Sequence, residues 1–159
     1  MTLTPRPYTS ADFMAVTEMW HYSKRAAFPY VALQQEYDIA RNRGYFQHEI
    51  VPNYQLWVAE MTGQIVGFMA YKPTYIDQLF VHLSYQGQGV GTALLNHAKA
   101  ISPQGLQLYT FEKNHVARQF YEQNGFRAIK FGVSPAPESE PDVLYEWKPK
   151  KTIDEGVES

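Results

Sequence analysis

Residues 76–92 have the sequence IDQLFVHLSYQGQGVGT and indicate how the middle of the chain folds. The apolar residues predict a strand over 75–83, and Leu94, Leu95, Ala98 and Ile101 recur at helical spacing further on. A glycine-rich turn, Gln86–Gly91, separates the two elements. Glycines permit positive φ and close approach of a ligand, and the free N–H groups at a helix start attract anions. The segment therefore predicts a binding site for a pyrophosphate.

Two common phosphate-binding motifs do not fit this turn. A Walker A loop requires Gly, four further residues and then Gly-Lys-Ser/Thr, and the turn has no such lysine. A Rossmann fingerprint counted from Gly87 and Gly89 requires a third glycine where the chain has Thr92. The spacing that does occur is Gln-x-x-Gly-x-Gly, formed by Gln86, Gly89 and Gly91. A nucleotide-binding regulator is therefore disfavoured.

The segments before this region predict two helical stretches and a hairpin. Ser10 is placed to cap a first helix, whose apolar residues Phe13, Val16 and Trp20 recur at helical spacing. A second helical stretch is expected from about 30 to 43, ended by Gly44. Strand-like runs over 56–60 and 65–71 flank Thr62-Gly63, which predicts a hairpin.

The segments after this region complete an α+β pattern. A strand is expected over 106–111, a helix over 115–124 that Gly125 ends, and two short strands over 126–133 and 143–147. The chain then combines helices at its start, a mainly antiparallel sheet and a β-α-β unit near its middle. We expect one domain over 1–149 and a flexible tail over 150–159.

Composition excludes several classes of function. The chain has 159 residues, 45% of them hydrophobic, and a net charge of −2, which fits one globular domain and gives no basic footprint for nucleic acid or an anionic membrane. No cysteine is present, so disulfides, thiolate metal sites and a cysteine nucleophile are excluded. The five histidines show no metal-ligand spacing, so no metal is expected. Without a signal sequence or an apolar run of ~20 residues, we predict a cytoplasmic protein with no membrane partner.

Three sequence blocks in the right order resemble the GNAT superfamily of N-acetyltransferases. They are Ile76-Asp77-Gln78-Leu79-Phe80-Val81, then Gln86-x-x-Gly89-x-Gly91, and then Asn114-x-x-Ala117-x-x-Phe120-Tyr121-x-x-x-Gly125-Phe126. The resemblance covers roughly residues 3–147 and is specific over 56–126. It implies the GNAT fold, a mixed and mainly antiparallel sheet of about six to seven strands with splayed central strands, flanked by about four helices.

The resemblance also implies acetyl-CoA as the acyl donor and assigns residues to it. The pantetheine arm would pair with the backbone of Phe80, Val81 and Leu83. The pyrophosphate would lie on the turn and helix start formed by Gln86, Gly87, Gln88, Gly89, Val90, Gly91 and Thr92. Asn114 would hydrogen-bond the cofactor or an ordered water, or serve only as a helix N-cap.

The chemistry implied is direct attack of a neutral amine on the thioester, which requires a proton acceptor and a proton donor. Tyr121 falls on the position that protonates the CoA sulfur in the family; the alternative is a ring that only packs. Asp77 is the candidate base, because it is expected to share a strand face with Tyr75 and Leu79. The alternatives are a structural carboxylate at Asp77, Glu112 as the base, or a water relay.

The acceptor site implied by the resemblance lies between the first two helices and the last hairpin. On this chain it would involve residues 134–145 and a group of aromatic and basic residues, Trp20, Tyr22, Arg25, Phe28, Tyr30 and Tyr37. The predicted function is N-acetyl transfer to a primary amine of a small molecule, a peptide or a protein. The alternative is an acyl-CoA-binding module without catalysis. The sequence is also compatible with a homodimer.

Overall fold

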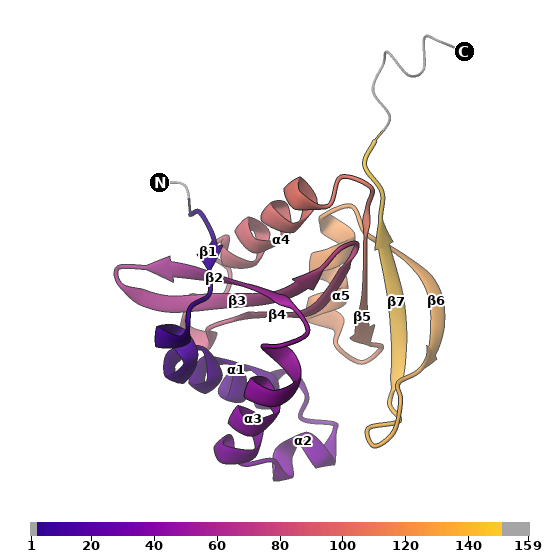
Figure 1. Cartoon of the computed structure of the whole chain (residues 1–159). Coiled ribbons are helices and arrows are strands. Elements are labelled where there is room, and N and C mark those ends of the chain that lie inside the picture. Colours follow the sequence, from indigo (N-terminus) through magenta and orange to yellow (C-terminus); the bar gives the residue numbers. More distant parts are fainter. Residues whose placement is uncertain (1–2, 151–159) are drawn as a thin grey trace, which may run out of the picture.

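The computed structural model describes residues 3–150 and contains a seven-stranded sheet with the strand order β1-β2-β3-β4-β5-β7-β6 (Figure 1). The strands are β1 (Arg6–Pro7), β2 (Gln55–Met61), β3 (Gln64–Lys72), β4 (Tyr75–Val81), β5 (Leu106–Phe111), β6 (Arg127–Val133) and β7 (Pro141–Trp147). Only the pair β4–β5 is parallel. The α+β prediction with a mainly antiparallel sheet is confirmed. Residues 151–159 of the predicted tail lie outside the described residues.

The α-helices number five within the described residues, one more than the four expected. They are α1 (Phe13–Ala27), α2 (Ala32–Glu36), α3 (Ile39–Tyr45), α4 (Val90–Ile101) and α5 (His115–Gln123). The additional helix arises because the stretch expected over 30–43 is broken at Tyr37, whose backbone is extended. Asp38 then caps α3 by accepting a hydrogen bond from the Arg41 N–H at 2.8 Å. Gly44 does not end this stretch, which continues through Tyr45 and one π-helical turn, η2 (Phe46–Ile50).

The start of α1 differs from the expectation by one residue. Thr9, and not Ser10, caps the short 3-10 turn η1 (Ser10–Asp12) that leads into α1. Asp12 accepts from the Thr9 N–H and from both terminal nitrogens of Arg6, each at 2.9 Å. Since Arg6 also bonds Glu60 on β2, this network ties the first helix to the sheet edge.

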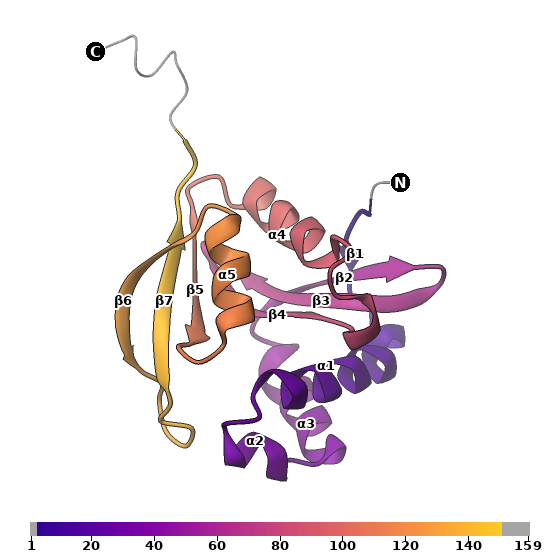
Figure 2. The same cartoon turned by 180° about the vertical axis from the view of Figure 1, so that it is seen from behind.

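Two hydrophobic cores cover the two faces of the sheet. From Phe68 to Tyr71 the buried residues of β3 alternate, so that Phe68 and Ala70 pack with Val16 and Trp20 of α1, whereas Met69 and Tyr71 pack toward α4. Figures 1 and 2 show α1, α2 and α3 gathered below the sheet and α4 above it. A strand buried on both faces reads as a continuous apolar run, which is why 65–71 was recognisable in the sequence.

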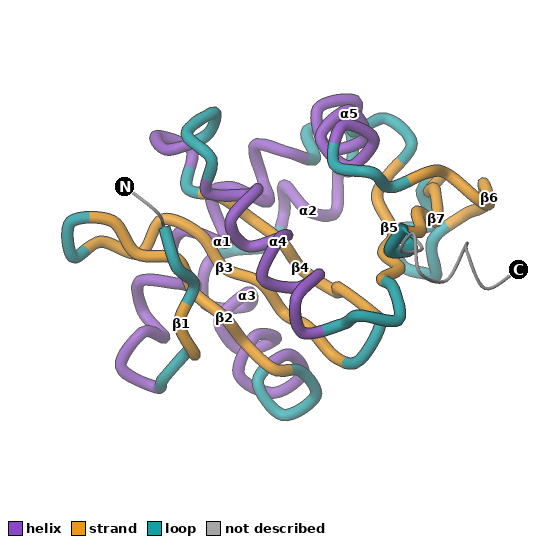
Figure 3. Tube along the Cα trace, turned by 90° about the horizontal axis from the view of Figure 1, so that it is seen from above, coloured by secondary structure: helices purple, strands orange, loops and turns teal. Residues whose placement is uncertain are grey.

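The sheet opens between β4 and β5. The two strands share one register pair, Tyr75 with Gln107, and beyond it they diverge. In the view from above, β5, β7 and β6 form a separate wing beside the β1–β4 part (Figure 3). The predicted splay of the central strands is confirmed, and it leaves the far half of β4 without a neighbour on that edge.

Candidate active site

A cavity of about 990 Å³ lies at the splay. Its walls come from the β4 and β5 strands, from α5, from the α1–α3 segment and from the connection between β6 and β7. Among the predicted site residues, Asp77, Phe80, Asn114 and Tyr121 line it. Val81, Leu83 and the glycine turn do not, so the site has two parts: a cavity and an exposed turn.

The free edge of β4 presents the backbone of Leu79 and Val81, and not that of Phe80. His82 N–H donates to the Val66 carbonyl at 2.8 Å, and the Phe80 carbonyl faces Gly67. Because backbone groups of successive residues in a strand point to opposite edges, His82, Phe80 and Gln78 bond to β3. The backbone groups of Leu79 and Val81 therefore point into the splay. The Phe80 backbone, expected to pair with the pantetheine arm, therefore faces β3 instead. The Phe80 ring lines the cavity and packs against Phe28 at a centroid distance of 6.1 Å.

The Val81 carbonyl already has two polar neighbours on the open side. The Ser23 hydroxyl of α1 donates to it at 3.1 Å and the Gln86 side-chain amide at 3.4 Å. Leu83, the third predicted backbone contact, starts the exposed 3-10 turn η3 (Leu83–Tyr85). Ser23 was not found from the sequence, because one serine within a helix carries no recognisable signal.

The glycine turn has the geometry that an anion site requires. Gly87 and Gly89 have φ of +77° and +85°, and Gly89 is the left-handed N-cap of α4. The N–H groups of Val90, Gly91 and Thr92 fall in the first helical turn, where no helical carbonyl can accept from them. They are available to an anion at the positive end of the helix.

Two glycines set how closely the surrounding elements approach the turn. A Cβ at Gly67 of β3 would lie 2.7 Å from the Val90 side chain, so only glycine allows α4 to sit on the sheet here. A Cβ at Gly91 would lie 3.2 Å from the Phe120 ring, which seats α5 against α4. The buried Val90 side chain acts as an anchor, and its predicted role at the cofactor rests on its N–H.

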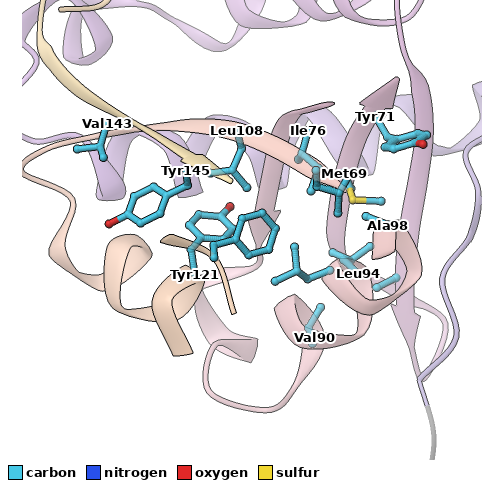
Figure 4. Close-up of a cluster of buried hydrophobic side chains, with 14 of the residues drawn as sticks. Met69, Tyr71, Ile76, Val90, Leu94, Ala98, Leu108, Tyr121, Val143 and Tyr145 are labelled. Atoms are coloured by element: carbon cyan, nitrogen blue, oxygen red, sulfur yellow. The ribbon is translucent and has the colours of Figure 1, made fainter. Parts of the chain in front are cut away.

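Tyr121 lies on α5 between the core and the cavity. Its ring packs against Phe126 and Tyr145, with centroids 5.6 and 6.2 Å away. Figure 4 shows Tyr121 beside Tyr145 in the core, and Tyr121 also lines the cavity. Burial raises the pKa of the Tyr121 phenol above its ordinary value of 10. The phenol is therefore a proton donor across neutral and moderately alkaline pH. The Tyr121 side chain can therefore both pack in the core and donate its phenol proton.

Asn114 closes β5 and opens α5. Its side-chain carbonyl accepts from the Ala117 N–H at 3.2 Å, which makes it the N-cap of α5. Because Asn114 also lines the cavity, the NH₂ end of its amide can still serve a ligand. The two interpretations of Asn114 are therefore compatible.

Asp77 occupies a β-bulge on β4. Ala70 pairs with Gln78 and Tyr71 with Ile76, which leaves Asp77 without a partner on β3. The bulge turns Asp77 and Gln78 toward each other, and the Gln78 amide donates to Asp77 Oδ2 at 3.0 Å. The predicted common face of Asp77 and Leu79 is not found, because Leu79 packs into the core under α4.

Tyrosines surround Asp77. Burial, followed by the charge of Asp77, raises the pKa of Tyr54 to about 12 and also raises the pKa values of Tyr75 and Tyr45. These phenols stay protonated beside the carboxylate. Glu112, the alternative base, does not line the cavity, whereas Asp77 does.

The predicted acceptor residues divide into two groups. Trp20, Phe28 and Tyr37 line the cavity, as do Ser134 and Asp142 from the last hairpin. Tyr22, Arg25 and Tyr30 do not. The Arg25 side chain instead donates to the carbonyls of Gln35 and Tyr37 at 2.9 and 3.4 Å and so ties α1 to α2 and to the residue that follows it, while Tyr22 is exposed.

Three buried polar residues in the same wall could not be recognised from the sequence: Lys24, Gln34 and Asn42. Lys24 Nζ donates to Asn42 Oδ1 at 3.0 Å, and Gln34 Nε2 donates to Glu138 Oε2 at 3.0 Å. Each residue falls in a polar stretch that helical spacing alone assigns to the surface. Only the packing of α1 against α3 and the β6–β7 connection buries them.

Two structural features are absent from residues 3–150. No group of three or more His, Asp or Glu side chains in this part of the chain is arranged to hold a metal ion. Within the same residues, no helix is both long and apolar enough to cross a membrane.

Comparison with known proteins gives a consistent set of matches. Residues 52–128 match the family model of the acetyltransferase (GNAT) domain. The peptidyl-lysine N-acetyltransferase YjaB of Salmonella typhimurium is 38% identical over 81 residues, which cover 50% of this chain and 54% of that protein. The chain thus spans about half the length of this curated relative. The peptidyl-lysine N-acetyltransferase YiaC of Escherichia coli is 25% identical over 120 residues, covering 75% of this chain and 80% of that protein.

Solved structures extend the likeness over nearly the whole fold. The solution structure of apo YjaB from Escherichia coli has a TM-score of 0.77 and 25% identity, covering 92% of this chain and 98% of that one. The PaiA N-acetyltransferase of Thermoplasma acidophilum, solved in complex with coenzyme A, has a TM-score of 0.66 and 18% identity, covering 94% and 100%. The second likeness concerns the fold alone.

Proposed function

We propose that the chain is an acetyltransferase of the GNAT superfamily, whose domain model matches residues 52–128, and that it transfers the acetyl group of acetyl-CoA directly to a primary amine. The observation that supports this most strongly is the splay between β4 and β5. It exposes the Leu79 and Val81 backbone on one edge of a cavity that also contains the buried phenol of Tyr121. β4 then leads, through η3, to the glycine turn.

Acetyl-CoA would span the two parts of the site, with its pyrophosphate at the glycine turn and its thioester in the cavity. The pyrophosphate would lie on the free N–H groups of Val90 to Thr92, and the pantetheine arm would extend along β4 as an added strand would, exchanging hydrogen bonds with Leu79 and Val81. The thioester would then reach the cavity beside Tyr121. The binding contacts come mostly from main chain.

An ammonium acceptor loses two protons in the transfer. The first must leave before the nitrogen can attack, and the second leaves the nitrogen as the amide forms and replaces the proton that Tyr121 gives to the sulfur. The amine nitrogen forms a bond to the thioester carbonyl carbon, and the carbon–sulfur bond breaks. Tyr121 donates its proton to the departing sulfur, which its raised pKa makes available at neutral pH. Asp77, or a water relayed to it, takes the proton that the ammonium must lose. Water around Asp77 can be ordered by the protonated phenols of Tyr54 and Tyr75.

The relatives named peptidyl-lysine N-acetyltransferases favour a primary alkylamine as the acceptor. A cytoplasmic location and a homodimer are carried forward as predictions from the sequence, to be measured by cell fractionation and by light scattering.

A thiol-release assay with acetyl-CoA across a panel of amines tests the proposal. The chain has no cysteine and so adds no thiol signal of its own. Amine-dependent CoA release supports the transferase. Thermal stabilisation by acetyl-CoA without release on any amine would identify the alternative, an acyl-CoA-binding module. If acetyl-CoA gave no thermal stabilisation and no amine released CoA, both the transferase and the binding module would be contradicted.

A further inference from the structure

Lys24 is a buried cation in the wall of the acceptor cavity. The residue is 8% exposed, yet it lines the cavity from α1. Its Nζ lies 3.0 Å from Asn42 Oδ1 and 3.9 Å from the centre of the Trp20 ring. Asn42 is itself held, because its Nδ2 lies 2.7 Å from His21 Nδ1. The ammonium is therefore fixed in position by three residues of α1 and α3.

No carboxylate pairs with this ammonium. The ion pairs found in residues 3–150 involve Arg6 and Lys113, and Lys24 takes part in none of them. An ammonium carries three donors, and Asn42 accepts from one of them. Burial lowers the pKa of Lys24 to about 8, which leaves the charged form dominant at pH 7. A buried charge of this kind is costly unless a partner compensates it.

The charges of this wall match a single negative charge. Arg41 stacks on Tyr37 at 4.0 Å and lines the cavity with Lys24, and Glu138 lines it as well, close enough for its charge to act on Lys24 without forming an ion pair. Two cations and one anion leave one net positive charge. A carboxylate carries one negative charge and balances this excess, whereas a phosphate dianion would exceed it and would face twice the repulsion from Glu138.

The opposite pole of the cavity is Asp77. Trp20 Nε1 donates to Gln78 Oε1 at 3.0 Å, and Gln78 in turn donates to Asp77. The indole and the Gln78 amide thus lie between the cation at Lys24 and the carboxylate at Asp77. One wall favours an anion and the other an ammonium group.

We propose that Lys24 binds a carboxylate of the acceptor, so that the substrate is a small molecule with both a primary amine and a carboxylate, as an amino acid has. This inference rests on the proposed acetyl transfer. A lysine residue of a protein fits less well, since its side chain carries no anion and the acids of neighbouring residues stay outside a cavity whose cation is buried.

Matched acceptors test the assignment. Amino acids would be compared with their carboxamides and with the corresponding decarboxylated amines by thiol release. Wild-type protein is expected to favour the acid at least tenfold in kcat/KM, and Lys24→Met is expected to remove this preference while still acetylating the amides. Lys99→Met is the control, because Lys99 is a half-buried lysine on α4 that does not line the cavity.

A wild-type enzyme that prefers amides, decarboxylated amines or lysine peptides would overturn the inference, as would a Lys24→Met variant that keeps the preference for acids. Binding of butanoate, a carboxylate without an amine, gives a second readout by calorimetry in the presence of CoA. Wild type and Lys99→Met should bind it and Lys24→Met and Lys24→Gln should not; equal binding by all four, or binding by none, contradicts the assignment. Because butanoate binding needs no turnover, it separates failure of this inference from failure of the proposed acetyl transfer.

Discussion

Residues 79–92 are expected to hold the acyl donor mainly through their backbone, whereas α1–α3 and the β6–β7 connection reach the site through side chains. On the first side the groups are the N–H and C=O of Leu79 and Val81 and the N–H groups at the start of α4. On the second side they are the side chains of Trp20, Lys24 and Glu138. A backbone site constrains few residue types beyond its glycines, so one donor can be held by many sequences. A side-chain pocket is specific to its own ligand.

The largest effect on this comparison should come from a carboxylate in the turn. Gly89→Asp places a negative charge and a Cβ where the pyrophosphate is expected, so the stabilisation by CoA should disappear. That stabilisation is about 2.7 kcal/mol at a concentration 100-fold above Kd. Differential scanning fluorimetry with and without CoA measures it.

Gly63→Asp is the matched control, because Gly63 has φ of +78°, close to the +85° of Gly89, and both have open space around the added Cβ. The two variants therefore share the backbone strain, but only one lies at the turn. If CoA raised the melting temperature of folded Gly89→Asp as much as that of the wild type, the turn would not be the pyrophosphate site.

The next largest effect should come from the proton donor. Tyr121→Phe is expected to lower kcat by ~10²–10⁴-fold with little change in the KM for acetyl-CoA, since protonation of a leaving group contributes on that scale. Because burial raises the pKa of Tyr121, wild-type kcat should not fall through loss of this proton up to about pH 10. Steady-state kinetics across pH give both numbers.

Tyr71→Phe controls for the loss of a buried phenol. Tyr71 is in the same core, and its hydroxyl donates to the Ile101 carbonyl at 3.2 Å, away from the cavity. Wild-type turnover in Tyr121→Phe would leave this ring with packing alone.

A smaller effect, dependent on pH, should come from Asp77→Asn. At pH 7 an alkylamine with a pKa of ~10 is protonated, so loss of the base should lower kcat/KM by about tenfold or more. The deficit should shrink toward pH 10, where the amine is already neutral. A deficit of constant size from pH 7 to pH 10 would make Asp77 a positioning residue.

The smallest effect should come from Ser23, which joins the two sides by donating to the Val81 carbonyl. Ser23→Ala should reduce the free energy of unfolding by about 0.5–1.5 kcal/mol and change kcat/KM for acetyl-CoA by no more than a few-fold. Chemical denaturation and kinetics measure the two effects. A loss of CoA binding in this variant would show that α1 takes part in holding the donor.

The two sides also differ in how far the sequence predicted them. The turn and α5 could be located because glycines at 87, 89 and 91 and the spacing to Tyr121 leave a local pattern. The bulge at Asp77 could not, since it depends on the register with β3, and it separates Asp77 from Leu79. Lys24 and Asn42 could not be found either, because their burial is made by helices that meet only in three dimensions.

The division of the site between backbone and side chains is tested most directly by a residue-resolved NMR titration of the amide groups with CoA. The account predicts that the N–H signals of Leu79, Val81 and the helix start at Val90–Thr92 shift, that the Phe80 N–H, which faces β3, shifts less than its two neighbours, and that Gly63 is unaffected. Shifts centred on α1–α3 or on the β6–β7 connection, with Val81 and Val90–Thr92 unchanged, would contradict it.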